Sequence, residues 1–151
     1  MNIAAVLSRR GRQFDCVPSD ASLFDAITVM HTRKIGSVGV KADGEPLPVG
    51  LISQGELIVA MATHGPMALT MAVTNFMRLP VPLCACADEV GRVLAMMTLT
   101  RSRHAVVLTE GTTLAGLVSM GDLVAAALED SRLEADVLRD MARSHLLATP
   151  N

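Results

Sequence analysis

The sequence contains no tryptophan and no tyrosine, and only three of its 151 residues are phenylalanine. Its acidic and basic residues are interspersed and give a formal net charge of -2. A chain of this kind lacks both the basic surface that attracts phosphates and the aromatic rings on which bases stack. Nucleic acid is therefore not an expected partner.

Long apolar runs are also missing. Hydrophobic residues make up 50% of the chain, but no run approaches the roughly 20 residues that a membrane helix needs. The apolar start at residues 3–7 is shorter than a signal-peptide core, and it is followed rather than preceded by Arg9 and Arg10. We therefore expect a cytoplasmic protein that has no membrane partner.

Cysteine is scarce and histidine is scattered. The three cysteines are Cys16, Cys84 and Cys86. No second cysteine pair or histidine follows at zinc-ligand spacing, and free cysteines are often buried, so we expect core thiols. His31, His64 and His145 have no nucleophile or paired carboxylate nearby in the sequence. We expect no metal site, no cofactor and no catalytic residue.

The dominant positive feature is an internal repeat. Residues 50–57, GLISQGEL, recur 66 residues later as residues 116–123, GLVSMGDL. Upstream, at an offset of 67, residues 26–30 correspond to 93–97, and residues 38–40 correspond to 105–107. The one-residue slip falls in a turn-rich connection. The duplication predicts two copies of one supersecondary unit.

Apolar spacing predicts the order strand, helix, strand, strand, helix within each copy. In the first copy the helices cover Leu23 to Met30 and Leu57 to Met61, and the later strands cover residues 38–40 and 49–52. The corresponding ranges in the second copy are 90–97, 123–128, 105–108 and 114–118. A unit of roughly 50 to 60 residues is marginal alone, so the two should share a core.

Each copy ends in the motif Gly-h-x-Ser-x-x-Asp/Glu, with h hydrophobic, at the start of a helix. In this the chain resembles a tandem pair of CBS domains, the arrangement called a Bateman module. It also resembles small free-standing bacterial proteins made of one such pair, at residues 7–11, 101–107 and 129–147. The resemblance implies an α/β (α+β) fold of two β-α-β-β-α units, packed as a pseudo-two-fold pair, with a C-terminal helix. The expected divisions are residues 1–75, 76–128 and 129–151.

The motif has two interpretations. Ser53 with Glu56, and Ser119 with Asp122, have the spacing of a capping box, which contributes about 1 kcal/mol and needs no ligand. The glycine three residues before each serine, inside an apolar strand, points instead to another group close to the backbone. The resemblance to CBS pairs implies that the acid accepts hydrogen bonds from the ribose hydroxyls of an adenine nucleotide.

The two potential sites are unequal, and we favour the second. Asp122 matches the ribose acid, whereas Glu56 is longer by one methylene. Arg103 and His104 precede a strand of the second copy, where the first copy has Gly36 and Ser37. The resemblance implies that Arg103 and His104 face the phosphates. The alternatives are a solvated strand end for the arginine and a half-buried imidazole for the histidine.

The resemblance also implies that the adenine lies between the first strand of a unit and the strand before the capping box. The predicted second site comprises Asp122, Ser119, Arg103, His104, Val118, Gly116, Leu83, Cys84 and Ala85. The doubtful first site comprises Glu56, Ser53, Ile52, Cys16, Val17 and Pro18. Lys34 and Arg101 correspond across the repeat, and we interpret them as surface charges with some chance of lining the cleft.

Residues 129–147 contain neither glycine nor proline and space Leu133, Val137 and Met141 as a helical stripe. The stripe either covers its own module or packs against a second subunit. We favour a homodimer, because two-fold pairs are the commonest oligomers.

Together these features predict a non-enzymatic regulatory module. It binds an adenine nucleotide, which is AMP, ADP, ATP, an NAD-type or an S-adenosyl ligand, in the cleft between the units. Binding shifts the packing of the two units and signals to an unidentified partner protein. The alternative is a ligand-free scaffolding protein with the same fold, and an enzyme acting on a nucleotide ranks third.

Overall fold

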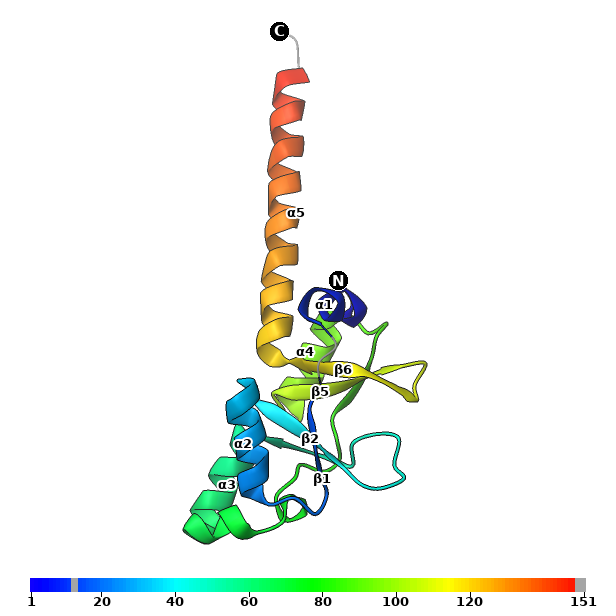
Figure 1. Ribbon diagram of the computed structural model, residues 1–151. Coiled ribbons are helices and arrows are strands. Elements are labelled where there is room, and N and C mark those ends of the chain that lie inside the picture. The colour runs from blue at the N-terminus through cyan, green and yellow to red at the C-terminus, as the bar shows by residue number, and fades with distance from the viewer. Residues whose placement is uncertain (12–13, 149–151) are drawn as a thin grey trace.

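The computed structural model describes residues 1–11 and 14–148, and it shows two three-stranded sheets with helices packed on them (Figure 1). The first unit contains β1 (Cys16–Pro18), α2 (Leu23–Arg33), β2 (Ser37–Lys41), β3 (Gly50–Ser53) and α3 (Gln54–His64). The second contains β4 (Leu83–Ala85), α4 (Val90–Leu99), β5 (His104–Thr109), β6 (Thr113–Ser119) and α5 (Met120–Ala148). Helix α1 (Ile3–Arg10) precedes the first unit, and the 3-10 helices η1 (Gly65–Thr70) and η2 (Val73–Asn75) connect the two. The predicted order of elements is confirmed in both units.

The two sheets share one topology and one register. Strand β1 pairs in parallel with β2, which pairs antiparallel with β3, and β4, β5 and β6 repeat this pattern. Cys16 lies opposite Gly39 and Leu83 lies opposite Val106, so the register repeats at the offset of 67 residues. Parallel neighbours need a crossover connection, and helices α2 and α4 supply it.

A buried cluster joins the two units. Leu51 of β3 packs with Val106 and Leu108 of β5, and all three side chains are less than a tenth exposed. Phe14 and Leu117 pack against the same cluster. The units therefore share a core, as the small size of each unit predicts.

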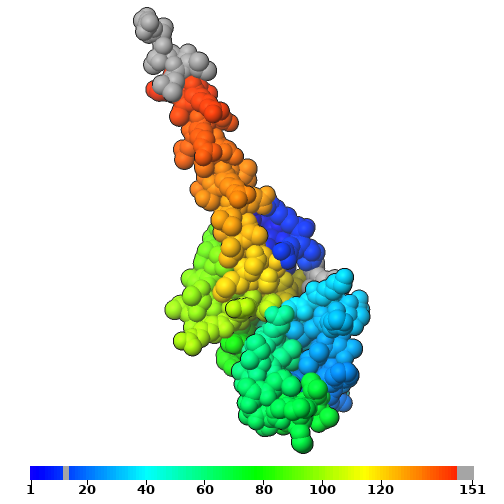
Figure 2. Space-filling model, turned by 90° about the vertical axis from the view of Figure 1, so that its left-hand side faces the viewer, coloured from blue at the N-terminus to red at the C-terminus, as the bar shows by residue number. Residues whose placement is uncertain are grey.

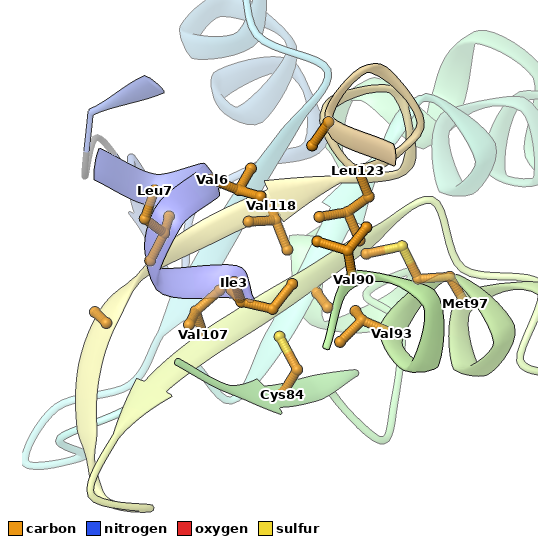
Figure 3. Packing of buried hydrophobic residues seen from close by; sticks show 13 residues of the cluster. Ile3, Val6, Leu7, Cys84, Val90, Val93, Met97, Val107, Val118 and Leu123 are labelled. Carbon is orange, nitrogen blue, oxygen red and sulfur yellow. The ribbon is translucent and has the colours of Figure 1, made fainter. Parts of the chain in front are cut away.

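Helix α1 packs on the second unit although it precedes the first in the chain. Its apolar face, Ile3, Val6 and Leu7, is buried in the core of the second unit, as Figure 3 shows. The N–H of Ile3 also donates to the carbonyl of Asp88 at 2.9 Å. We expected this segment to group with the first unit, but it packs on the second. Proximity in the sequence does not decide which core buries an apolar helix face.

The C-terminal helix is not a separate element. Helix α5 runs without a break from the capping box of the second unit to Ala148, because residues 122–148 contain neither glycine nor proline. Its outer half stands clear of the rest of the chain in both Figure 1 and Figure 2. Residues 149–151 of the expected tail lie outside the described residues. No helix in the described part of the chain has the length and apolar character needed to cross a membrane.

The repeated glycines before the capping boxes have structural explanations. A Cβ built on Gly50 would lie 2.4 Å from Sδ of Met77, so the group that approaches this backbone belongs to the chain itself. Gly116 has a φ of 154°, beside an irregularity in the pairing of β5 with β6. Bulges of this kind often need glycine. The interpretation of both glycines as marks of a ligand is therefore not required.

Candidate functional site: the cavity between the two units

A cavity of about 290 Å³ lies between the two units, next to the start of helix α5. The segment before β1 contributes Arg10, Gly11, Phe14 and Asp15, the first unit contributes Lys34, Ile35, Gly36 and Ser37, and the second unit contributes His104, Leu117, Ser119 and Asp122. Phe14, Ile35 and Leu117 make part of the wall apolar, and two carboxylates, two cationic side chains and an imidazole line it as well. Such a mixture suits a ligand that has an apolar ring and charged groups.

Asp122 uses both carboxylate oxygens inside the protein. Its Oδ2 accepts the backbone N–H of Ser119 at 3.0 Å, and its own N–H donates to Oγ of Ser119 at 3.2 Å. This is the capping box that the spacing predicts. Its Oδ1 forms an ion pair with Arg10, which lies at the end of helix α1. Only 10% of the Asp122 side chain is exposed.

Glu56 has the equivalent arrangement in the first unit. Its Oε2 accepts the backbone N–H of Ser53 at 3.0 Å, and its Oε1 accepts Nε of Arg78 at 3.0 Å. Each acid therefore closes a capping box and pairs with one arginine. Both arginines come from a segment that precedes the other unit.

The two arginines differ in how firmly they are held. Arg78 also donates from Nη1 to the carbonyl of Thr100 at 3.2 Å and from its backbone N–H to the carbonyl of Leu51 at 2.7 Å. The Arg10 side chain is 59% exposed, against 33% for Arg78. Among the described residues Asp122 is its one polar side-chain contact. A ligand can therefore displace Arg10 from Asp122 far more readily than Arg78 from Glu56.

His104 reaches the cavity, whereas Arg103 does not. The imidazole of His104 is half-buried and packs over Gly36, where a built Cβ would lie 3.5 Å from its Nε2. Burial lowers the pKa of His104, although Asp122 and Glu56 raise it in part, and Arg103 lowers it further. The neutral ring offers one donor and one acceptor. Arg103 is exposed and does not line the cavity, in agreement with a solvated strand end.

The structure does not bring the predicted strand of the second unit to Asp122. Leu83, Cys84 and Ala85 lie outside the lining of this cavity. Cys84 is buried in the core of the second unit, where desolvation raises the pKa of its thiol to about 12. The segment before β1, with Phe14 and Asp15, takes the place assigned to β4. The reason is the pseudo-two-fold packing, which sets the start of each unit against the capping box of the other.

The remaining predicted site residues are also dispersed. Val118 and Ile52 are buried in the cores of their units, and Gly116 lies outside the cavity lining. Cys16, Val17 and Pro18 line a separate hollow with residues 41–45. Of the predicted second site, the structure therefore brings Asp122, Ser119 and His104 together.

Several cavity residues escaped the sequence analysis, namely Arg10, Phe14, Asp15 and Ser37. Lys34, interpreted mainly as a surface charge, also lines the cavity. One sequence signal could have found some of them. Equivalent residues of a repeat lie close together where they approach the two-fold axis, and Gly36 and Ser37 are the equivalents of Arg103 and His104. Because His104 was a predicted site residue, its equivalent Ser37 was a candidate for the same cavity.

The described residues contain no group of three or more His, Cys, Asp or Glu side chains that could hold a metal ion. Cys16, Cys84 and Cys86 are free. Burial raises the pKa of the Cys16 thiol as well, so it stays protonated near neutral pH.

Comparison with known proteins agrees with this geometry. The family model described as the CBS domain matches residues 9–63. A CBS-domain containing protein from Agrobacterium tumefaciens is 31% identical, with a TM-score of 0.79, and the match covers 84% of this chain and 99% of that one. The chain belongs to the CBS domain family. Its second β-α-β-β-α unit repeats the fold of the first, so it contains a tandem pair of CBS units.

Two more distant similarities are found. A CBS domain protein from Pyrobaculum aerophilum, solved in complex with AMP, is 20% identical with a TM-score of 0.70, over 81% of this chain and 89% of that one. The 3-isopropylmalate dehydrogenase of Xanthomonas oryzae pv. oryzae is 27% identical over 133 residues, which are 84% of this chain and 37% of that enzyme. The chain thus spans a little over a third of the length of the curated relatives that it matches.

The half-buried imidazole of His104 should make the stability of this CBS pair depend on pH. Because the pKa of His104 lies below its usual 6.5 in the folded state, the unfolded chain binds the proton first as pH falls. Stability contributed by the neutral ring is therefore present above pH 6.5 and is lost below it. We expect the free energy of unfolding to fall between pH 7 and pH 5, and to fall less in His104→Gln. Urea titrations of both proteins at each pH measure this, and identical pH dependence would contradict it.

Proposed function

We propose that this CBS pair is a regulatory, non-catalytic module that binds an adenine nucleotide in the cavity beside Asp122. The observation that carries the proposal is the composition of that cavity, in which a carboxylate at a helix start lies with cationic, imidazole and apolar side chains. The AMP complex of the Pyrobaculum protein supports the choice of ligand. AMP, ADP, ATP, NAD-type and S-adenosyl ligands share the adenosine group on which the proposal rests.

The parts of an adenine nucleotide match the parts of the cavity. Two vicinal ribose hydroxyls are donors, and the Asp122 carboxylate is a charged acceptor for them. Phosphate oxygens need cationic or N–H donors, and Arg10, Lys34 and His104 line the same space. The adenine ring needs an apolar slot, which Phe14 and Leu117 can supply.

Arg10 offers a route from the cavity to the rest of the molecule. Ribose hydroxyls that bind Asp122 replace the guanidinium of Arg10 as its partner. The preceding residue, Arg9, forms an ion pair with Glu129 on helix α5. Displacement of Arg10 therefore alters the end of α1 where it contacts α5, and we propose that a partner protein reads this change. A ligand can produce it only through its different affinity for the two arrangements.

One observation favours the scaffolding alternative. Asp122 is already satisfied by Ser119 and Arg10, so the fold does not require a ligand to neutralise it. A scaffold needs only the capping box and the ion pair, whereas a nucleotide site needs the acid to exchange its partner. Binding measurements on matched variants separate the two functions.

We expect Asp122→Ala to weaken AMP binding by about tenfold or more, because a hydrogen bond to a charged group contributes about 1.5 to 3 kcal/mol. Glu56→Ala is the matched control, since it also removes the acid of a capping box that pairs with an arginine. Glu56→Ala should change the affinity for AMP much less, because Arg78 stays paired with Glu56 and keeps this carboxylate unavailable to a ligand. Calorimetry with AMP, ADP and ATP on folded variants measures both effects. Equal losses of affinity in the two variants would contradict the assignment of the site. A wild-type protein that binds none of these nucleotides would favour the scaffolding function instead.

We also propose that the protein is a homodimer and that the outer half of α5 forms the contact. Its exposed apolar residues are Leu133, Val137, Leu138 and Met141, each more than half exposed. Residues 129–136 carry four acids and one arginine, whereas residues 139–143 carry two arginines and one acid. An antiparallel pair of helices sets the acidic half of each beside the basic half of the other.

Truncation after Leu128 should convert the dimer to a monomer, because it removes the apolar stripe. Val137→Glu in the intact chain should do the same, since it places a charge at the centre of the stripe. Arg132→Glu changes an exposed residue on the face of the helix away from Val137 and Leu138, and it serves as the control. Sedimentation velocity measures the state of each protein. An intact chain that is monomeric at high micromolar concentration would refute the dimer.

We propose a cytoplasmic location, because the three free thiols suit a reducing compartment.

A further inference from the structure

Two buried polar atoms in the cavity wall have no partner. Oδ2 of Asp15 and Oγ of Ser37 are both shielded from solvent, and neither forms a hydrogen bond in the part of the chain that the structure describes. Ser37 is only 2% exposed. Both residues line the cavity that holds Asp122. Buried polar groups are normally paired, so an unpaired carboxylate oxygen at a cavity indicates a ligand that brings a donor.

The fold does not require an acid at position 15. The carbonyl of Asp15 accepts the N–H of Gly39 at 2.9 Å, which fixes the backbone before β1. At the equivalent place in the second unit, the carbonyl of Pro82 accepts the N–H of Val106 at 2.8 Å. The same backbone bond thus forms with a residue that has no polar side chain. The Asp15 carboxylate is therefore an addition to the cavity rather than a part of the fold.

Asp15 lines the same cavity as three apolar residues. Phe14, its neighbour in the chain, lines the cavity and lies against Gly39, where a built Cβ would be 2.6 Å from the ring. Ile35 and Leu117 line the cavity as well. An aromatic ring with aliphatic neighbours suits a nucleobase, and a polar group beside it reads the edge of the base.

We infer that Asp15 accepts a hydrogen bond from the exocyclic amine of the adenine, and that it selects adenine over purines without this amine. This inference rests on the proposed nucleotide function and names the determinant of base choice. The phosphates carry no donor that could serve Asp15, and the ribose hydroxyls face Asp122. Ser37 can donate its hydroxyl proton to the ring nitrogen beside the amine, which completes the edge of the base.

The free oxygen of Asp15 favours adenine over guanine. Its Oδ1 faces Nε of Arg33 at 3.7 Å, which leaves Oδ2 as the oxygen for the ligand. Adenine presents one amine donor next to an acceptor on this edge. Guanine presents two adjacent N–H donors and a keto oxygen, and one carboxylate oxygen cannot serve both donors.

The test compares two ligands that differ by the amine alone, AMP and purine riboside 5′-monophosphate. Wild-type protein should bind AMP about tenfold or more tightly than the analogue, by calorimetry. Asp15→Ala should lose most of its affinity for AMP and little of its affinity for the analogue, so that the ratio approaches one. Asp15→Asn keeps the size of the side chain, and it should reduce the ratio in the same direction if Asp15→Ala fails to fold. Asp20→Ala removes an exposed acid outside the cavity and should leave the ratio unchanged.

The outcomes separate this inference from the proposed function. A wild-type protein that binds neither ligand overturns both. Binding of AMP with an unchanged ratio in the Asp15 variants overturns the role of Asp15 and leaves the nucleotide function standing. Tighter binding of GMP than of AMP also overturns the inference, because it shows that Asp15 reads paired donors.

Discussion

Each capping acid of this CBS pair forms an ion pair with an arginine that lies outside its own β-α-β-β-α unit in the sequence, and these two ion pairs decide which acid a ligand can reach. Arg10, which precedes the first unit, pairs with Asp122, and Arg78, which precedes the second, pairs with Glu56. A carboxylate at a helix start is favoured by the capping N–H groups and by the helix dipole. Arg10 thus joins the end of α1 to helix α5, and Arg78 joins the segment before the second unit to helix α3 and, through the carbonyl of Thr100, to the second unit.

The duplication preserves this arrangement, and the site depends on the few places where the copies differ. Arg78 is fixed by Thr100 and by the backbone of Leu51, whereas Arg10 has Asp122 alone among the described residues. The cavity is also lined by equivalent positions that carry different residues, since His104 of the second unit corresponds to Ser37 of the first. Two similar folds thus produce one cavity in which an acid can exchange its partner.

The order of elements and both capping boxes could be predicted from the sequence, because they depend on local spacing. Ser119 with Asp122 is a relation between residues three apart, and the strands and helices follow apolar periods. Leu83 was assigned to the site of Asp122 on the assumption that each unit builds its own site, and the structure places it outside the cavity. The pseudo-two-fold axis instead sets the segment before one unit against the end of the other.

Asp15 belongs to no recognisable motif, so only its position in space marks it. Arg10 lies within residues 7–11, which carry part of the resemblance, but no sequence pattern links it to Asp122. The docking of α1 on the second unit is a long-range choice between two cores, and the sequence carries no local signal for it. The division expected after residue 128 does not interrupt α5, and the lack of glycine and proline between Gly121 and Ala148 is the sequence signal for this continuity. Sequence patterns were thus reliable within a unit and failed where the two units meet.

The central claim is that an adenine nucleotide replaces Arg10 at Asp122. A crystal structure of the protein grown with millimolar AMP tests it most directly. We expect AMP in the cavity between the units, with its ribose hydroxyls on the Asp122 carboxylate and the guanidinium of Arg10 displaced. AMP bound elsewhere, or an empty cavity with the ion pair of Arg10 and Asp122 intact, would contradict it.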